Sequence, residues 1–160
     1  MKRDCVMGID PGLTGGLAII SPEEGLLMEP MPRNEEFIEM LMVSEFLFEH
    51  GPRLKMVFIE QANAMPKQGV SSMFKFGRVF GALEGIIATH KLPCTYVRPQ
   101  QWTKKMHEGL SKDIDTKERS RIIFSRLFPG IDSTASEKSS KPHMGMVEAA
   151  LIAEYGRRVL

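Results

Sequence analysis

Two apolar segments that each end in an acidic residue constrain the fold of this chain most. Residues 5–10 read CVMGID and residues 54–60 read LKMVFIE, which predicts two buried strands ending at Asp10 and Glu60. A strand of this kind is usually covered on both faces of its sheet, and its last residue emerges at the sheet edge. An acidic group there is costly to bury unless it is paired or binds a cation.

Asp10 and Glu60 converge if these two strands are neighbours. Carboxylates held close together raise each other's pKa unless a divalent cation lies between them. Mg²⁺ suits such oxygen ligands, and two ions can clamp the attacking and leaving oxygens of a phosphodiester. The alternative is that the two acids cap nearby helices or simply meet solvent.

The order of the remaining patterns is three strands, a helix, a strand, a helix, a strand and further helices. This order predicts a mixed α/β layer fold in a single domain spanning residues 1–160. The expected strands cover residues 5–10, 17–20, 26–31, 54–60 and 95–98. The expected helices cover residues 34–50, 71–90, 99–102, 115–128 and 142–157. We expect Asn34 to cap the first helix and Pro142 to occupy the first turn of the last. The apolar side of the first helix is expected to consist of Phe37, Ile38, Leu41, Leu47 and Phe48.

Length and composition narrow the class of protein. A chain of 160 residues with 42% hydrophobic and 26% charged residues is typical of one globular domain. No apolar run approaches the roughly 20 residues that cross a bilayer, and the N-terminus lacks a signal-peptide pattern. We therefore expect an intracellular protein, in a bacterial or phage-host cytoplasm or, after removal of a transit peptide, in an organelle. Cys5 and Cys94 are predicted to be buried, reduced thiols, because no Cys/His cluster indicates zinc.

Positive charge is concentrated in the second half of the chain. Residues 1–90 contain 8 Lys and Arg against 12 Asp and Glu, whereas residues 91–160 contain 13 against 8. A basic face in the second half would suit a polyanionic partner. The alternative is a solvated surface of mixed charge.

Four segments, in order along nearly the whole chain, carry a family resemblance. They are GIDPGLTGGLA at residues 8–18, IEQ at 59–61, VRPQQW at 97–102 and VEAALIAEYG at 147–156. Together they resemble RuvC-type Holliday junction resolvases, and the third segment resembles the phage and organelle members. The resemblance implies an RNase H-like mixed five-stranded sheet flanked by helices. It also implies a homodimer that makes paired, Mg²⁺-dependent nicks in four-way DNA junctions, with Mn²⁺ as a substitute and no small-molecule cofactor. By the same resemblance, the catalytic metal ligands are Asp10, Glu60 and Glu148.

Residue 144 departs from the family pattern. Relatives usually carry another acid, or sometimes His, one helical turn before the acid of the last helix, but here the residue is Met144. A thioether is a poor ligand for Mg²⁺. Three interpretations follow: His143 serves as ligand or general base, the site is natural but weak, or a substitution has disabled cutting while binding persists. For His143 itself, the alternative is a surface residue at the start of the helix.

Basic residues predict how DNA would be held, since phosphate contacts supply much of the affinity of such proteins. The candidate DNA-binding residues are Lys67, Arg98, Lys104, Lys105, Lys112, Lys117 and Arg121. The resemblance places Lys117 close to the cut strand, and a solvated basic helix is the alternative for the others. Met65 is the candidate apolar wedge at the junction centre, with Phe74 and Phe76 as alternative probes; each of these side chains could instead belong to the core.

Three glycines spaced four residues apart mark one face of the expected helix 71–90. Gly77, Gly81 and Gly85 each cost about 1 kcal/mol relative to Ala in a helix interior, which indicates a close approach of another backbone. The helix either packs flat on the sheet or meets its copy across a two-fold axis, and a two-fold dimer would suit two symmetric cuts.

Other functions compete with junction cleavage. Met144 favours a junction-binding protein that does not cut, and the strand order also allows an RNase H-like nuclease acting on another nucleic acid, such as an RNA–DNA hybrid. The glycine-rich turn after residue 10 weakly resembles actin-like ATPases, but 160 residues leave no room for their second subdomain.

Overall fold

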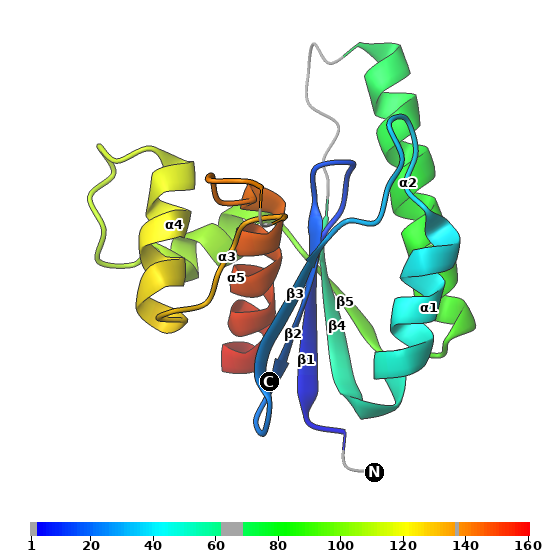
Figure 1. The fold of residues 1–160 in the computed structure, drawn as a ribbon, viewed down its shortest axis with the longest axis horizontal. Helices are drawn as coiled ribbons and strands as arrows, with labels where there is room; N and C mark the ends of the chain where they lie inside the picture. Colours follow the sequence, from blue (N-terminus) through cyan, green and yellow to red (C-terminus); the bar gives the residue numbers. More distant parts are fainter. Residues whose placement is uncertain (1–2, 62–68, 137) are drawn as a thin grey trace.

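The protein is a mixed α/β domain whose central sheet has helices on both faces (Figure 1). The structure is a computed structural model that describes residues 3–61, 69–136 and 138–160. The strands within these residues are β1 (Cys5–Asp10), β2 (Gly16–Ser21), β3 (Gly25–Pro30), β4 (Leu54–Glu60) and β5 (Cys94–Val97). The helices are α1 (Met40–His50), α2 (Val70–Thr89), α3 (Pro99–Met106), α4 (Thr116–Leu127) and α5 (Met144–Val159), with a 3-10 turn at Gly51–Arg53.

The strand order β3-β2-β1-β4-β5 makes the two acid-ending strands neighbours. β1 is antiparallel to β2 and parallel to β4, and β5 continues the parallel part beside β4. Ile9 pairs with Ile59, so the next residues, Asp10 and Glu60, leave the same edge of the sheet. The mixed five-stranded sheet expected from the sequence is confirmed, and with it the convergence of these two strand ends.

Side chains alternate between two cores, one on each face of the sheet. Met7 and Ile9 of β1 point toward α1 and α2, where they join Val43 and Leu83. Val6 of β1 points to the other face, which α3, α4 and α5 cover (Figure 1). Both faces of the central strands are therefore covered and shielded from solvent, which explains their near-continuous apolar sequences.

Helix α5 lies unusually close to β1 and β2 because glycines line the contact. A Cβ placed on Gly8 would lie 2.1 Å from the carbonyl oxygen of Ala149, and one on Gly16 would lie 2.6 Å from that of Gly145. No side chain fits at either position. This close packing places the first turns of α5, including Glu148, beside the end of β1.

The first and last helices begin later than the sequence predicted. Asn34 does not cap a helix: its Oδ1 accepts the N–H groups of Glu36 and Phe37 in a local turn, and α1 begins only at Met40. Such side-chain bonds compete with helix formation. At the other end of the chain, His143 rather than a residue before Pro142 is the N-cap of α5.

Several apolar side chains assigned to the core lie at the surface. The exposed fraction is 51% for Phe37, 71% for Leu41 and 75% for Phe48, whereas Ile38 and Leu47 are buried as expected. Phe37 precedes α1, and within the helix Leu41 and Phe48 lie off the face that Val43 and Leu47 bury in the core.

The two cysteines differ in their surroundings. Both are free thiols; Cys5 is buried, whereas Cys94 is only partly buried, contrary to the prediction. Burial, with the nearby negative charge of Glu84, raises the pKa of Cys94 to about 11, so its thiol is protonated at neutral pH. None of the helices in the described part of the chain is long and apolar enough to span a membrane.

Candidate active site at the ends of β1 and β4

Three carboxyl groups from three separate elements meet at one edge of the sheet. Asp10 ends β1, Glu60 ends β4, and Glu148 comes from the second turn of α5. Burial raises the pKa of Asp10 well above its usual range, and the negative charges of Glu148 and Glu60 raise it further. The three sequence-predicted carboxylates are thus close enough to repel one another.

Asp10 and Glu148 are joined directly by a hydrogen bond between their carboxyl groups. This contact raises the pKa of Asp10 and lowers that of Glu148. Burial and the charge of Glu60 nevertheless hold the pKa of Glu148 above its ordinary value. A cation bound between the carboxyl groups would relieve their repulsion.

Glu60 is held by the indole of Trp102. The Trp102 Nε1–H donates to Glu60 Oε2 at 2.5 Å. Burial raises the pKa of Glu60, and the bond from Trp102 opposes that shift because it favours the charged carboxylate. Trp102 was not among the predicted site residues, although its position just after the strand parallel to β4 indicates a place beside Glu60.

Lys117 supplies a positive charge next to the carboxyl cluster. The residue lies in the first turn of α4, where Asp115 caps the helix by accepting the Lys117 N–H at 2.9 Å. The Lys117 ammonium lowers the pKa of both Asp10 and Glu148, against the larger effect of burial. The site therefore combines three carboxyl groups with the ammonium group of Lys117 at its edge.

The donor set suits a hard divalent cation, but its side chains are turned toward other partners. Among the residues that the structure describes, no group of three or more His, Cys, Asp or Glu side chains is arranged to hold a metal ion. Asp10 and Glu148 face each other, and Glu60 faces Trp102. Carboxylate oxygens are nevertheless the ligands that Mg²⁺ prefers.

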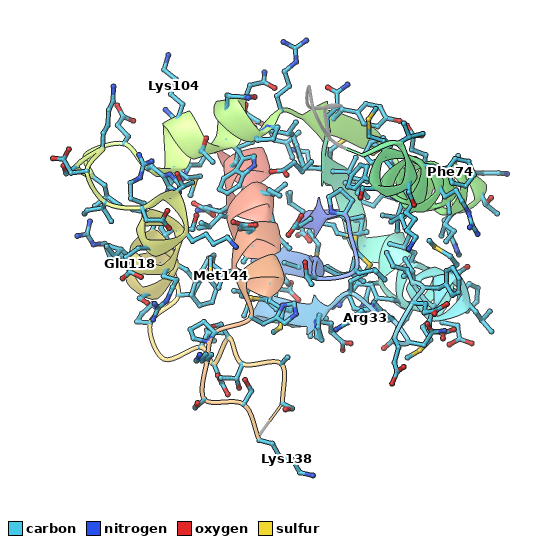
Figure 2. All side chains as sticks on the ribbon, turned by 90° about the horizontal axis from the view of Figure 1, so that it is seen from above. Arg33, Phe74, Lys104, Glu118, Lys138 and Met144 are labelled. Atoms are coloured by element: carbon cyan, nitrogen blue, oxygen red, sulfur yellow. The ribbon has the colours of Figure 1, made fainter. Side chains whose placement is uncertain are left out.

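His143 caps α5, and Met144, labelled in Figure 2, is the first residue of this helix, one turn before Glu148. The His143 Nδ1 accepts the backbone N–H of Met146 at 3.3 Å, so that nitrogen serves as the helix cap. Partial burial and the positive charge of Arg33 lower the pKa of His143. Met144 packs against the core beneath α5. The structure thus gives each residue a structural role and leaves only Nε2 of His143 for a ligand.

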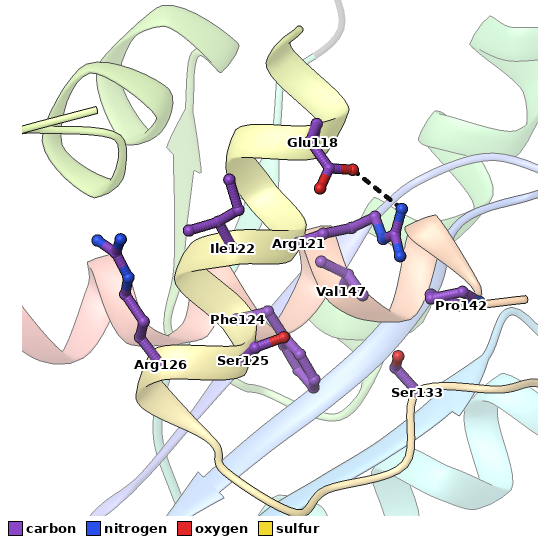
Figure 3. A pocket seen from close by; sticks show the side chains of 9 residues that line it. All are labelled: Glu118, Arg121, Ile122, Phe124, Ser125, Arg126, Ser133, Pro142 and Val147. Carbon is purple, nitrogen blue, oxygen red and sulfur yellow. Dashed lines mark hydrogen bonds and ion pairs between the residues drawn. The ribbon is translucent and has the colours of Figure 1, made fainter. Parts of the chain in front are cut away.

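Most of the candidate DNA-binding side chains are exposed on α3, on α4 or on the segments next to these helices. Arg98 and Lys104 line an open cavity of about 650 Å³ at the start of α3. Arg121 lines a cleft of about 370 Å³ between α4 and α5, where it forms an ion pair with Glu118 at 2.9 Å (Figure 3). Lys105 and Lys112 are also exposed. Lys67 and the wedge candidate Met65 lie outside the described residues.

The glycine face of α2 is open. Among the residues that the structure describes, a Cβ built on Gly77, Gly81 or Gly85 would meet nothing within 4 Å, and all three residues are exposed. Helix α2 packs on the sheet through Leu83 and Ile87 instead, so the glycine face takes no part in that contact. Phe74, on the same helix, has an exposed fraction of 67%, whereas Phe76 stacks on Phe80.

Comparisons with known proteins bear on the fold. A scan of protein-family models and a search of curated proteins found no match. Among solved structures, Thermus thermophilus RuvC in complex with a Holliday junction substrate is similar, with a TM-score of 0.64 and 19% identity over 97% of this chain and 95% of that one. A second Thermus thermophilus RuvC structure has a TM-score of 0.60 and 18% identity over 98% of this chain and 96% of that one. The chain therefore has the RuvC-like, RNase H-like fold that its four sequence segments predicted.

Proposed function

We propose that this protein is a Mg²⁺-dependent endodeoxyribonuclease that resolves four-way DNA junctions by paired nicks. One observation carries the proposal: Asp10, Glu60 and Glu148 converge at one sheet edge in a chain with the fold of RuvC. A carboxyl cluster with raised pKa values at a partly open edge is a poor way to stabilise a fold, and such clusters mark functional sites.

The three carboxylates would hold Mg²⁺, with Mn²⁺ as a substitute. Bound there, a divalent cation would supply Lewis-acid activation of water and would neutralise charge on the scissile phosphate. Asp10 and Glu148 would act as ligands in their ionised forms, which their raised pKa values disfavour until a cation binds. Lys117, which already lies within the field of these carboxylates, is placed to contact a phosphate at the site.

DNA would lie across the basic surface around the cluster. The basic residues proposed to contact DNA lie just before α3 (Arg98), on α3 (Lys104 and Lys105), on α4 (Lys117 and Arg121) and between the two helices (Lys112). Met65 remains our candidate for an apolar wedge at the junction centre and Lys67 for a phosphate contact. A homodimer formed through the open glycine face of α2 would present two sites to two symmetric strands.

A junction-binding protein that does not cut is the second candidate, because Met144 replaces a usual ligand. His143 is the proposed substitute, through Nε2, since its Nδ1 already caps α5. If Met144 is limiting, Met144→Asp would add a carboxylate one turn before Glu148 and raise the nicking rate.

The test is cleavage of a synthetic mobile four-way junction, labelled separately on each strand, with and without Mg²⁺. We expect paired, symmetric nicks from the parent protein, none from Glu60→Gln, and weaker cutting of an RNA–DNA hybrid. Junction binding without nicks, restored by Met144→Asp, would support the second candidate. Faster cutting of the hybrid than of the junction would contradict both.

A further inference from the structure

Trp102 is the only tryptophan of the chain, and it is buried against a proposed metal ligand. Its exposed fraction is 2%, and its Nε1–H donates to Glu60 Oε2 at 2.5 Å. A buried indole needs a hydrogen-bond acceptor, but any backbone carbonyl could serve. Here the acceptor is one of the three carboxyl groups of the candidate active site.

The backbone fixes the indole close to Glu60. Glu60 pairs with Val97 across β4 and β5, and the Gln61 N–H donates to the Val97 carbonyl at 2.8 Å. Helix α3 starts two residues later, where the Gln101 side-chain oxygen accepts the Arg98 N–H and the Gln101 N–H donates to the Arg98 carbonyl, each at 2.9 Å. Trp102 therefore lies in the first turn of a helix that begins directly beside the end of β4.

Packing behind the indole restricts its rotation. The His107 ring meets Trp102 edge-on, with ring centroids 5.9 Å apart. His107 is in turn held by a hydrogen bond of 3.0 Å between its Nε2 and the Ser120 hydroxyl, and both residues are buried. The indole is thus supported by a polar contact that ties α3 to α4.

We infer that Trp102 is a positioning residue for the metal site, which holds Glu60 in one rotamer and leaves its second oxygen for the cation. The inference rests on the proposed function, in which Glu60 is a ligand. An indole N–H is a neutral donor with no acceptor capacity. It can therefore orient a carboxylate without bringing a positive charge that would compete with the metal, as Arg or Lys would.

The informative substitution is Trp102→Phe, which keeps an aromatic ring in the core and removes the N–H. Loss of such an outer partner usually weakens metal binding by about 10–100-fold. We expect Mn²⁺ affinity of the protein alone, measured by electron paramagnetic resonance, to fall by that factor. Nicking should fall at low Mg²⁺ and recover at high Mg²⁺, while junction binding in EDTA should be unchanged.

Met106→Ala is the matched control for damage to the core. Met106 lies on the same helix and in the same apolar cluster and has no polar contact with Glu60. Its truncation should lower the melting temperature at least as much as Trp102→Phe but leave Mn²⁺ affinity unchanged. Equal losses of affinity in the two variants would mean that packing, not the hydrogen bond, matters.

A second measurement needs no substitution at Trp102. Because the chain has one tryptophan, tryptophan fluorescence reports on Trp102 alone. Addition of Mg²⁺ should shift the emission of the parent protein but not that of Glu60→Gln. An unchanged emission in a parent that binds Mn²⁺ and nicks junctions, or full Mn²⁺ affinity in Trp102→Phe, would overturn the inference and leave the proposed function intact. A parent that neither binds Mn²⁺ nor nicks would instead overturn the proposed function.

Discussion

The carboxyl groups of Asp10, at the end of β1, and Glu148, on α5, lie beside each other, and the charge of Glu148 adds to burial in raising the pKa of Asp10. Neither the sheet nor the helix requires an acid at these positions, and burial disfavours the charge of both. The pair is therefore a local weakness of the fold at neutral pH. Such weakness is common where a site is built for a ligand rather than for stability.

Asp10→Asn should stabilise the metal-free protein at neutral and alkaline pH. The pKa of Asp10 is raised in the folded state, so its contribution to stability is fully present below the unfolded pKa of about 3.9 and is lost as pH rises through the folded value. An amide stays neutral and avoids that loss. In EDTA at pH 8, calorimetry should show a higher melting temperature than in the parent, by about 2–4 °C for each kcal/mol gained.

The difference between Asp10→Asn and the parent should shrink as the pH is lowered toward 4. Glu108→Gln, a neutralisation at an exposed position of the chain, serves as control and should show no such trend. Superimposable melting temperatures of parent and Asp10→Asn at every pH would contradict the raised pKa. Nicking should be lost in Asp10→Asn, since the amide is a weak metal ligand.

Gly8→Ala should damage both the fold and the proposed activity. The new Cβ would lie 2.1 Å from the Ala149 carbonyl oxygen and 2.4 Å from the Ala153 nitrogen, which are backbone atoms that cannot swing aside. Helix α5 must move away from β1, at a cost of about 2–3 kcal/mol. Glu148 moves with it, and a displacement near 1 Å can reduce a reaction rate about 100-fold.

Chemical denaturation and junction nicking measure the two effects of Gly8→Ala. Gly69→Ala is the control, because a Cβ at Gly69 meets nothing within 4 Å; its free energy of unfolding should stay close to that of the parent. If Gly8→Ala were as stable as the parent and nicked junctions at the same rate, the close packing of α5 on β1 would not be needed to position Glu148.

The sequence predicted the sheet and the ends of its acidic strands because these depend on local pattern. Runs such as CVMGID show burial on both faces, and the family resemblance added Glu148 from a helix far along the chain. The predicted start of α1 was wrong because the Asn34 side chain accepts hydrogen bonds from Glu36 and Phe37 in a turn. The same residue types favour helix caps and such turns, so the sequence does not distinguish the two.

The partners of the site could not be predicted in the same way. The bond from Trp102 to Glu60 depends on which strand lies beside β4, and the contact between Asp10 and Glu148 depends on how closely α5 approaches β1. Gly8 and Gly16 permit that approach, but a glycine in a strand does not show which backbone lies over it. The glycines of α2 show the same ambiguity, and only the structure reveals that their face is open.

Gly81→Leu should prevent dimerisation without harming the monomer. A side chain at position 81 enters open space in the single chain, and Leu is the better helix former by up to about 1 kcal/mol. Across a two-fold axis the same side chain would meet its own copy. Sedimentation velocity should show a dimeric parent and a monomeric Gly81→Leu protein with unchanged circular dichroism.

Ser125→Leu is the control for an added surface leucine, since Ser125 is exposed on α4, across the sheet from α2. It should leave the sedimentation coefficient unchanged. An intact dimer in Gly81→Leu, or a monomeric parent at micromolar concentration, would exclude the glycine face of α2 as the dimer interface.

Lys117→Gln should weaken junction binding because it removes an electrostatic contact with a phosphate, without changing the shape of the protein. Lys117 is exposed on α4, yet its charge reaches Asp10 and Glu148, so a phosphate at the site would lie beside it. Loss of one phosphate contact should reduce the slope of log affinity against log salt concentration by about 0.9. Fluorescence anisotropy in EDTA measures this slope.

Lys55→Gln is the control, because it removes an equal charge at the start of β4, the opposite end of that strand from Glu60. It should leave the slope unchanged. Equal slopes in the parent and in Lys117→Gln would mean that Lys117 balances the carboxylates alone and does not contact DNA.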